Sequence, residues 1–409
     1  MLNKVEEQQA NNDDKSVVDK ATIDKVVNHK SIVNVAVAVI HHQEQYLLGF
    51  RNSSQHQGNR YEFVGGKIDS HETASAALIR EVSEETGIDI QSNHLVKLGR
   101  LHHDYGDKQV CLQVYKVALT AEQYKQHQHC DYGLEGQALT WATKSQLLAG
   151  DYPLPAANQT ILAWLQLPTQ MTVTYPLIHF SEDTDASNAW LAYHQQHISK
   201  NTWVYIRTKA SELESKVASK TKVTDAELAA QLMHLRPDIY SVLPYANGYQ
   251  HDSTDKILTK SETPENTPPA EISNQVVAVH LTHHELMCWF NGFQNDDSED
   301  KSKGSQYDSS SRPLIVSCHD AESIHTANQF AATRLQHQKP PVIGIFLSPV
   351  LATQSHPDSE PLGWQAWSAL AQLADMPVIG LGGLSPIMFE QADQYGAISI
   401  AGIRQFLQG

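Results

Sequence analysis

The stretch that decides the fold reads Gly66-Lys-Ile-Asp-Ser-His-Glu72, then seven residues, then Arg80-Glu81-Val82-Ser83-Glu84-Glu85-Thr86-Gly87-Ile88. It predicts a loop followed by a helix over 73–86, with Ser70 as the N-cap and Gly87 as the C-terminal stop. Glu72 is expected in the first turn, where the helix dipole favours an acid. One buried face is expected from apolar residues at helical spacing, which are Ala74, Ala77, Leu78 and Val82.

Three carboxylates share another face of this helix. Glu81, Glu84 and Glu85 stand at i, i+3 and i+4, so they stack within about one turn and repel each other. A solvated acidic surface is the ordinary explanation of such a cluster, but only Arg80 is interleaved to relieve the repulsion. A hard divalent cation relieves it best, and carboxylates with Mg2+ can face a substrate phosphate.

These residues resemble in full the Nudix box, G-x5-E-x7-R-E-U-x-E-E-x-G-U, where U is aliphatic. The resemblance implies an α/β/α sandwich with a mixed sheet that hydrolyses nucleoside diphosphates linked to another moiety, using Mg2+ or Mn2+. It also implies that Arg80 orients the glutamates. The metal-binding groups that it implies are Glu81, Glu84, Glu85 and the carbonyl of Gly65.

The residues around the box are similar to those of the MutT-type 8-oxo-dGTP diphosphatases, over about residues 32–165. They are Gly49-Phe50-Arg51, His56, Glu62-Phe63-Val64-Gly65-Gly66, Tyr132-Gly133-Leu134-Glu135-Gly136-Gln137, Trp141 and Leu154-Pro155-Ala156-Ala157-Asn158. The resemblance implies that the oxidised purine is held by a substrate-binding set of Arg51, His56, Phe63 and Asn158. It also makes Glu135 a further metal-linked carboxylate. Val64 departs from the family, which usually has Pro there, and this affects the stiffness of the loop.

The expected reaction is hydrolysis of 8-oxo-dGTP to 8-oxo-dGMP and pyrophosphate, which sanitises the nucleotide pool and prevents replication errors. A water held by the metal attacks the β-phosphorus, with Glu81 or Glu135 as the base. An Asn amide offers a donor and an acceptor together, so Asn158 could read a purine edge while Phe63 packs on its face. The alternative keeps the chemistry on another diphosphate, either ADP-ribose or an oxidised thiamine diphosphate.

The second half of the chain predicts a TIM (β/α)8 barrel, because eight β-rich runs recur there, most of them separated by amphipathic stretches. The runs are Val173–Ile178, Trp203–Arg207, Ile239–Leu243, Val276–His280, Leu314–Cys318, Val342–Leu347, Val378–Leu381 and Ile398–Ala401. Further motifs in this half are Arg207-Thr-Lys209, Val279-His280-Leu281, Ser317-Cys318-His319, Pro361-Leu362-Gly363-Trp364, Pro377-Val-Ile-Gly-Leu-Gly382-Gly383 and Gly396-Ala397. In these motifs the chain resembles thiamine-phosphate synthase over about residues 172–407. A phosphate-binding set is expected after the last two strands, formed by Gly382, Gly383, Ala401 and Gly402.

The barrel also departs from that family. Pro244-Tyr245-Ala246 stands where the family has an Asn-Asp pair, and Thr353-Gln354-Ser355-His356 stands where it has a Thr-x-Thr-Lys loop. The second metal carboxylate of the family corresponds to Glu285. Without the missing Asp and Lys, ionisation of a diphosphate loses charge compensation. We therefore expect a barrel that is catalytically weak or inactive and that binds thiamine phosphate or serves a structural role, with a residual synthase as the alternative.

Length and charge agree with this organisation. The chain has 409 residues, which favours two domains, and 30 Lys and Arg against 46 Asp and Glu give a net charge of −16, which disfavours a nucleic-acid polymer as partner. We expect a flexible leader over 1–30, a Nudix domain over 31–168 and a barrel over 172–409, with disordered insertions near 250–274 and 293–311. A cytoplasmic protein without a membrane span is expected, since its four cysteines are far apart and no signal peptide is visible. Most histidines are expected on the surface.

Overall fold

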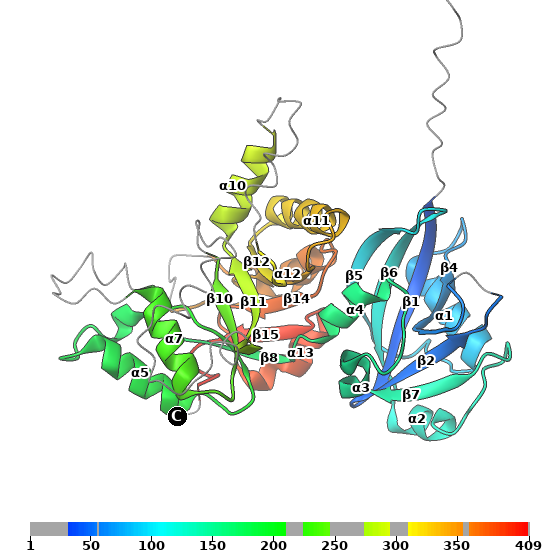
Figure 1. Ribbon diagram of the computed structural model, residues 1–409, viewed down its shortest axis with the longest axis horizontal. Coiled ribbons are helices and arrows are strands. Elements are labelled where there is room, and N and C mark those ends of the chain that lie inside the picture. The colour runs from blue at the N-terminus through cyan, green and yellow to red at the C-terminus, as the bar shows by residue number, and fades with distance from the viewer. Residues whose placement is uncertain are drawn as a thin grey trace, which may run out of the picture.

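The computed structural model describes residues 32–54, 57–209, 224–245, 274–294, 310–354 and 360–407. It arranges them as two units side by side (Figure 1). The predicted leader and most of the two predicted insertions lie outside the described residues. None of the helices in the described residues is long and apolar enough to cross a membrane.

The first unit is built on a seven-stranded mixed sheet. Its strand order is β3-β2-β1-β6-β5, with β4 also paired to β1 and β7 to β2. Only β1 and β6 run parallel, and the other pairs are antiparallel. The elements are β1 (Ile32–His42), β2 (Gln45–Arg51), β3 (Arg60–Glu62), β4 (Val64–Lys67), α1 (Ala74–Thr86), β5 (Leu95–Asp104), β6 (Gln109–Ala118), α2 (Ala121–His127), β7 (Leu139–Thr143), α3 (Lys144–Ala149) and α4 (Asn158–Leu165).

Both faces of β1 are covered by helices. Ala36 and Ala38 pack with Leu78 of α1, whereas the alternate residues Val37 and Val39 pack in the core cluster that includes Ile161 of α4. Successive side chains of a strand point to opposite faces, so this continuous apolar strand requires a cover on each side. The predicted α/β/α sandwich is confirmed, and β1 and β2 form an antiparallel hairpin within it.

The second unit is a closed barrel of eight parallel strands in the order β10-β11-β12-β13-β14-β15-β8-β9, which confirms the predicted fold. Its strands are β8 (Gln170–Val173), β9 (Trp203–Tyr205), β10 (Tyr240–Pro244), β11 (Val276–Leu281), β12 (Leu314–Cys318), β13 (Val342–Leu347), β14 (Val378–Leu381) and β15 (Ser399–Gly402). Its helices among the described residues are η1 (Leu177–Phe180), α5 (Ala186–His197), α7 (Asp225–Leu235), α10 (His283–Gln294), α11 (Ala321–Gln336), α12 (Gly363–Ala371), η3 (Pro386–Met388) and α13 (Phe389–Gln394).

The first barrel strand differs from its prediction. The run Val173–Ile178 was expected as the strand, but β8 ends at Val173 and the short helix η1 follows. Pro176 has no N–H to donate to a neighbouring strand, so the ladder does not continue through it. Leu177 and Phe180 are nevertheless buried in a core cluster, which is why the segment has the apolar character of a strand.

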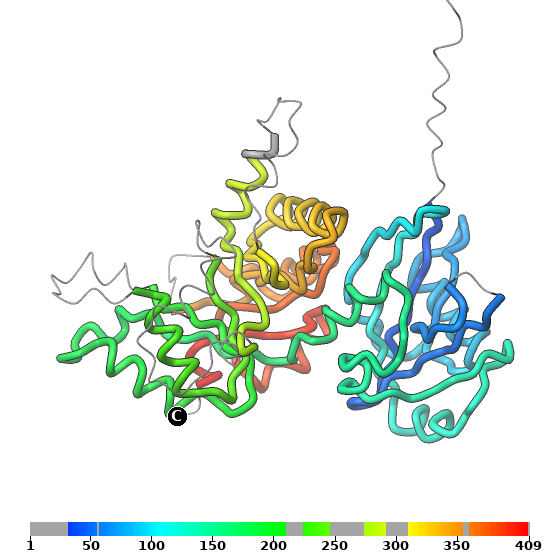
Figure 2. Tube along the Cα trace, viewed as in Figure 1, coloured from blue at the N-terminus to red at the C-terminus, as the bar shows by residue number. Residues whose placement is uncertain are grey.

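The two units meet along a packed junction. Figure 2 shows the trace leaving the first unit through α4 and entering the barrel. The Trp164 indole of α4 donates a hydrogen bond to the Val342 carbonyl of β13 at 3.0 Å. On β5, the Arg100 side chain donates two hydrogen bonds to the Asp375 carboxylate, at 3.0 and 3.1 Å. A single core cluster includes residues of both units, so the junction is continuous with the interior.

Candidate active site

Helix α1 carries the acidic residues, and both of its ends are fixed by capping. The Thr73 hydroxyl accepts a hydrogen bond from the Ala76 N–H, and Gly87 adopts a left-handed φ of 74° that ends the helix as predicted. The prediction of Ser70 as the N-cap was wrong. Glu72 consequently precedes the helix instead of lying in its first turn, and it is held there by a side chain further along α1.

That side chain is Arg80, which gathers the loop and the helix. Its Nη2 donates to Glu72 Oε1 at 2.6 Å and to the Lys67 carbonyl at 3.1 Å. Its Nη1 donates to Glu81 Oε1 at 2.9 Å and to Glu84 Oε2 at 3.0 Å. The hydrogen bond from Arg80 lowers the pKa of Glu72, and these carboxylates together raise the pKa of Arg80. Arg80 thus holds the box loop against the acidic face of α1.

Two glycines let the loop strand β4 approach its neighbours. Gly65 has a φ of 150°, and a side chain on it would collide with the Ala36 carbonyl of β1. A side chain on Gly66 would occupy the position of the Glu81 carboxylate. Only glycine allows such close approaches. The Glu81 carboxylate therefore lies directly against the backbone of the loop whose Gly65 carbonyl was predicted to bind metal.

Glu85 is an acid in an unfavourable electrostatic environment. Burial, together with the carboxylates of Glu62, Glu81 and Glu135, raises its pKa to about 8, and a backbone hydrogen bond from Gly65 partly opposes this rise. Burial also raises the pKa of Glu62 to about 7, which the neighbouring Arg51 opposes. Adjacent carboxylates disfavour each other's charged forms unless a cation intervenes. Without a cation, Glu85 is therefore largely protonated near neutral pH.

The loop that carries Glu135 is fastened to the end of α1. The Leu134 N–H and the Gln137 side-chain amide both donate to the Glu85 carbonyl, at 2.8 and 3.1 Å. The Gly133 N–H donates to the Gln137 carbonyl at 2.8 Å and closes the loop. Glu135 itself is exposed to solvent. These bonds bring Glu135 within electrostatic range of Glu85, although the two are far apart in the sequence.

Two of the predicted substrate-binding residues, Phe63 and Asn158, lie on the α4 side of the sheet. Arg51 Nη1 donates to Glu62 Oε2 at 2.9 Å, and its buried Nε has no partner among the described residues. Phe63 is 3% exposed and packs in the same core cluster as the residues of α4, whose first residue is Asn158. Asn158 is 7% exposed. His56 lies outside the described residues.

The predicted metal ligands fit a hard cation by their chemistry. Carboxylate and carbonyl oxygens are the ligands that Mg2+ and Mn2+ prefer, and besides burial it is three neighbouring carboxylates that raise the pKa of Glu85. In the part of the chain that the structure describes, no group of three His, Cys, Asp or Glu side chains is positioned to hold a metal ion. Arg80 instead pairs with Glu81 and Glu84, so metal binding requires some of these side chains to reorient.

Sequence reasoning missed two groups beside this cluster. Glu62 was noted only as part of a family pattern, yet it contacts Arg51 and affects the pKa of Glu85. Tyr105 was not considered, although the charges of Arg51 and Glu62 both affect its pKa, which burial raises. Glu62 could have been found from its place beside the two loop glycines. Tyr105 gives no such signal, because it joins the site only through the pairing of β5 and β6.

The predicted phosphate-binding residues of the barrel lie together at the ends of β14 and β15. These two strands pair, with Leu381 opposite Ala401. Gly382 and Gly383 have φ values of 100° and 69°. A side chain on either would collide with the loop 349–352, at 2.9 Å from Pro349 Cβ for Gly382. Packing alone therefore accounts for both glycines, and their binding of phosphate stays a prediction.

Glu285, the predicted counterpart of a metal carboxylate, has a local role in the structure. Its Oε2 accepts hydrogen bonds from the Thr282 N–H and hydroxyl, at 2.8 and 2.7 Å. Thr282 in turn accepts from the Glu285 N–H at 3.3 Å, so the pair forms a capping box at the start of α10. His356 of the divergent loop lies outside the described residues.

Comparison with known proteins assigns the first unit to a family. The family model described as NUDIX domain matches residues 35–164. The 8-oxo-dGTP diphosphatase of Escherichia coli (strain K12) is 30% identical over 135 residues, which are 33% of this chain and 96% of that protein. The CTP pyrophosphohydrolase of the same strain is 28% identical over 137 residues, 32% of this chain and 89% of the relative. A solved structure of MutT, from work on the Aliivibrio salmonicida and Vibrio cholerae proteins, shares 25% identity with a TM-score of 0.25 and covers 32% of this chain and 94% of its own.

Together with the NUDIX match, the mixed sheet between helices and the carboxylates clustered against a glycine loop define the first unit as a hydrolase. The chain belongs to the Nudix hydrolase family, with its Nudix unit of the MutT type.

The second unit resembles a different family. The model described as Thiamine monophosphate synthase matches residues 314–406, which include strands β12 to β15. The putative thiamine-phosphate synthase 2 of Aquifex aeolicus (strain VF5) is 36% identical over 64 residues, which are 16% of this chain and 34% of that protein. The likeness is thus concentrated in the second half of the barrel.

Proposed function

We propose that this chain hydrolyses 8-oxo-dGTP to 8-oxo-dGMP and pyrophosphate and so removes a nucleotide that causes replication errors. The observation that carries the proposal is the position of Glu62. It pairs with Arg51 on one side and affects the pKa of Glu85 on the other, so the predicted base-binding residues adjoin the acidic cluster. A nucleotide with its base toward Arg51 and its phosphates toward Glu85 fits this order.

Recognition of an oxidised purine needs polar groups that the normal base leaves unpaired. The buried Arg51 Nε is an unused donor among the described residues, and Asn158 offers both a donor and an acceptor. Glu62, whose pKa is raised to about 7, can carry a proton near neutral pH and then donate a hydrogen bond as well. These three side chains are the proposed readers of the base.

The proposed cation is Mg2+ or Mn2+, held by the carbonyl of Gly65 and the carboxylates of Glu81, Glu84, Glu85 and Glu135. When bound there, the ion supplies neutralising charge for the phosphates and lowers the pKa of water. In the proposed reaction a water oxygen attacks the β-phosphorus and the bond from that phosphorus to the α–β bridging oxygen breaks. Glu81 or Glu135 accepts the proton of the water, and Arg80 holds Glu81 in place at 2.9 Å.

The test is the substrate profile of the full chain with Mg2+, comparing kcat/KM for 8-oxo-dGTP, dGTP and CTP. We expect 8-oxo-dGTP to be preferred over dGTP by at least 100-fold, within the range that hydrogen-bond readout achieves. Arg51→Met should reduce that preference, whereas Lys125→Met on the exposed face of α2 should leave it unchanged. Equal kcat/KM values for 8-oxo-dGTP and dGTP contradict the proposed substrate. A preference for CTP would assign the chain the activity by which one relative is named.

A second candidate is hydrolysis of a thiamine-type diphosphate, because the barrel matches a thiamine monophosphate synthase model. Oxidised thiamine diphosphate and ADP-ribose belong in the same assay, and a higher kcat/KM for either favours this candidate. We also propose that the barrel binds thiamine phosphate beside Gly382 and Gly383. Calorimetry on the full chain should then give binding heat with thiamine phosphate, and no heat at millimolar ligand contradicts this role.

A further inference from the structure

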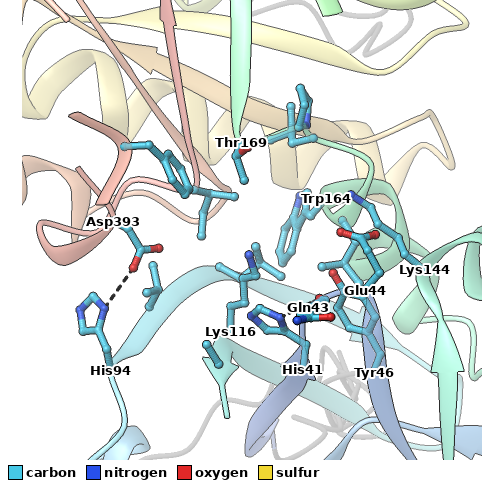
Figure 3. Close-up of a pocket in the computed structure, with 18 of the residues that line it drawn as sticks. His41, Gln43, Glu44, Tyr46, His94, Lys116, Lys144, Trp164, Thr169 and Asp393 are labelled. Carbon is cyan, nitrogen blue, oxygen red and sulfur yellow. Dashed lines mark hydrogen bonds and ion pairs between the residues drawn. The ribbon is translucent and has the colours of Figure 1, made fainter. Parts of the chain in front are cut away.

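A cavity of about 810 Å3 lies between the two units (Figure 3), and its lining includes none of the glutamates of the acidic cluster. One wall comes from the first unit, from the turn after β1 and from β2, β5 and β6. The other wall comes from α13, and the connection from α4 to β8 lies between them. The cavity has no role in the hydrolysis proposed above.

Two lysines from the first unit line this cavity. They are Lys116, near the end of β6, and Lys144, the first residue of α3. Both are only partly exposed. Among the described residues neither amine has an ion-pair partner within 4 Å. Two partly buried cations without close counterions therefore face one cavity.

The acidic residues of the lining do not neutralise these lysines at short range. Asp393 of α13 pairs instead with His94 at 3.4 Å, as the dashed line in Figure 3 shows. Glu44 and Glu390 are exposed to solvent. Burial lowers the pKa of Lys116, and Lys144 lowers it further, while Asp393 and Glu44 oppose them from a distance. The buried part of the cavity thus has a local need for negative charge.

The remaining lining is largely aromatic and apolar. The His41 ring stacks on Tyr46 with 5.6 Å between the ring centroids, and Trp164 and Phe389 also line the cavity. Burial lowers the pKa of His41 to about 4, so this ring is neutral at physiological pH and belongs with the apolar surface. Such a lining suits the flat or apolar body of a small molecule.

We propose that this junction cavity binds a small organic anion, with one compact anionic head beside Lys116 and Lys144 and an aromatic or apolar body toward Trp164. The head is a phosphate monoester or a carboxylate, since both give charge-assisted hydrogen bonds with lysine. A polyphosphate does not fit, because its added charges would face Glu44, Glu390 and Asp393. The ligand touches both units, so its binding stabilises their junction.

The test is calorimetry on the full chain in EDTA, which suppresses metal-dependent binding at the Nudix site. The probes are phenyl phosphate and benzoate, with benzyl alcohol as the neutral analogue. We expect at least one anion to bind and benzyl alcohol to give no heat. Lys116→Met and Lys144→Met should each weaken binding at least tenfold, whereas Lys125→Met, the same change on α2 outside the cavity, should not.

The outcomes distinguish the two possible anionic groups of the ligand. Binding of phenyl phosphate alone indicates a phosphate, and binding of benzoate alone indicates a carboxylate. Lys116→Arg keeps the charge and should retain most of the affinity, which distinguishes loss of charge from damage to the fold. No heat from either anion at millimolar concentration, or an unchanged Kd in both methionine variants, overturns the proposal.

Discussion

The surroundings of Glu85 in the folded chain disfavour its charged form, so the stability of the chain should depend on pH. Its pKa of about 8 in the folded chain exceeds the ordinary value of 4.5, so the folded state binds more protons between these values. The contribution of Glu85 to the free energy of unfolding is therefore fully present below pH 4.5 and declines as the pH rises toward 8. In EDTA at pH 9, Glu85→Gln should raise the free energy of unfolding by about 2 kcal/mol, measured with urea, with little change at pH 4.

The control for this prediction is Glu84→Gln, because Glu84 is half exposed and paired with Arg80. It should not stabilise the chain at pH 9. Glu85→Gln should at the same time abolish hydrolysis, and Mg2+ should stabilise the unsubstituted chain more than this variant. A gain in stability that is equal at pH 4 and pH 9 would contradict the electrostatic account of Glu85.

At the residue scale, the sequence predicts the acidic cluster better than the groups around it. Glu81, Glu84 and Glu85 are one helix turn apart, so their proximity follows from the helix alone. The approach of Glu62 to Glu85 depends on how β4 folds back on α1, and spacing along the chain does not report it. Most histidines were expected on the surface, but His41 is only half-exposed and lines the cavity between the two units.

At the element scale, the observed N-cap of α1 allows a prediction of how substitutions there change stability. Thr73→Ala should destabilise the chain by about 1 kcal/mol, because it leaves the Ala76 N–H without its acceptor. Ser70→Ala should have an effect near zero, since Ser70 is exposed and does not cap the helix. Urea unfolding measures both. Equal losses in the two variants would mean that the cap is not the one observed.

Elements with strong local patterns were predicted closely, and others were missed. Strands β12, β13 and β14 have the predicted bounds, because each is a short apolar run buried on both faces. Strand β4, Val64–Lys67, was missed since two of its four residues are glycines, which are depleted in strands. It forms because β1 supplies an antiparallel partner, and that pairing is non-local.

On the scale of the whole molecule, β5 of the first unit makes direct contacts with the second unit. A side chain on Gly99 would stand 2.6 Å from the Trp164 ring and 2.8 Å from the Asp375 carbonyl. The register of β5 against β6 shifts between Lys97 and Gly99. The Lys97 amine then donates to the Gln372 carbonyl at 2.8 Å. Nothing in the sequence of β5 alone indicates the contacts with Gln372 and Asp375, because these residues lie about 275 positions later.

The ion pair of Arg100 and Asp375 offers the sharpest test of this junction. Its two hydrogen bonds are joined by a third, from the Arg100 N–H to the Asp375 carbonyl at 3.1 Å. Asp375 is largely buried, with 17% of its side chain exposed, so the pair is less screened than a surface pair. A double-mutant cycle of Arg100→Met and Asp375→Asn should give a coupling energy of about 1 kcal/mol in urea unfolding.

The same single substitutions should also make the two units unfold less cooperatively. Each unit has its own sheet, and the contacts that couple their unfolding are those of the junction. We expect the calorimetric transition of the full chain to broaden or to split in Arg100→Met, while Arg236→Met, which breaks a pair inside the barrel at 2.7 Å, should shift the barrel transition alone. If the two substitutions at the junction prove additive and the transition keeps its width, the contacts of Arg100 do not hold the units together. Packing around Gly99 and Trp164 then carries the junction.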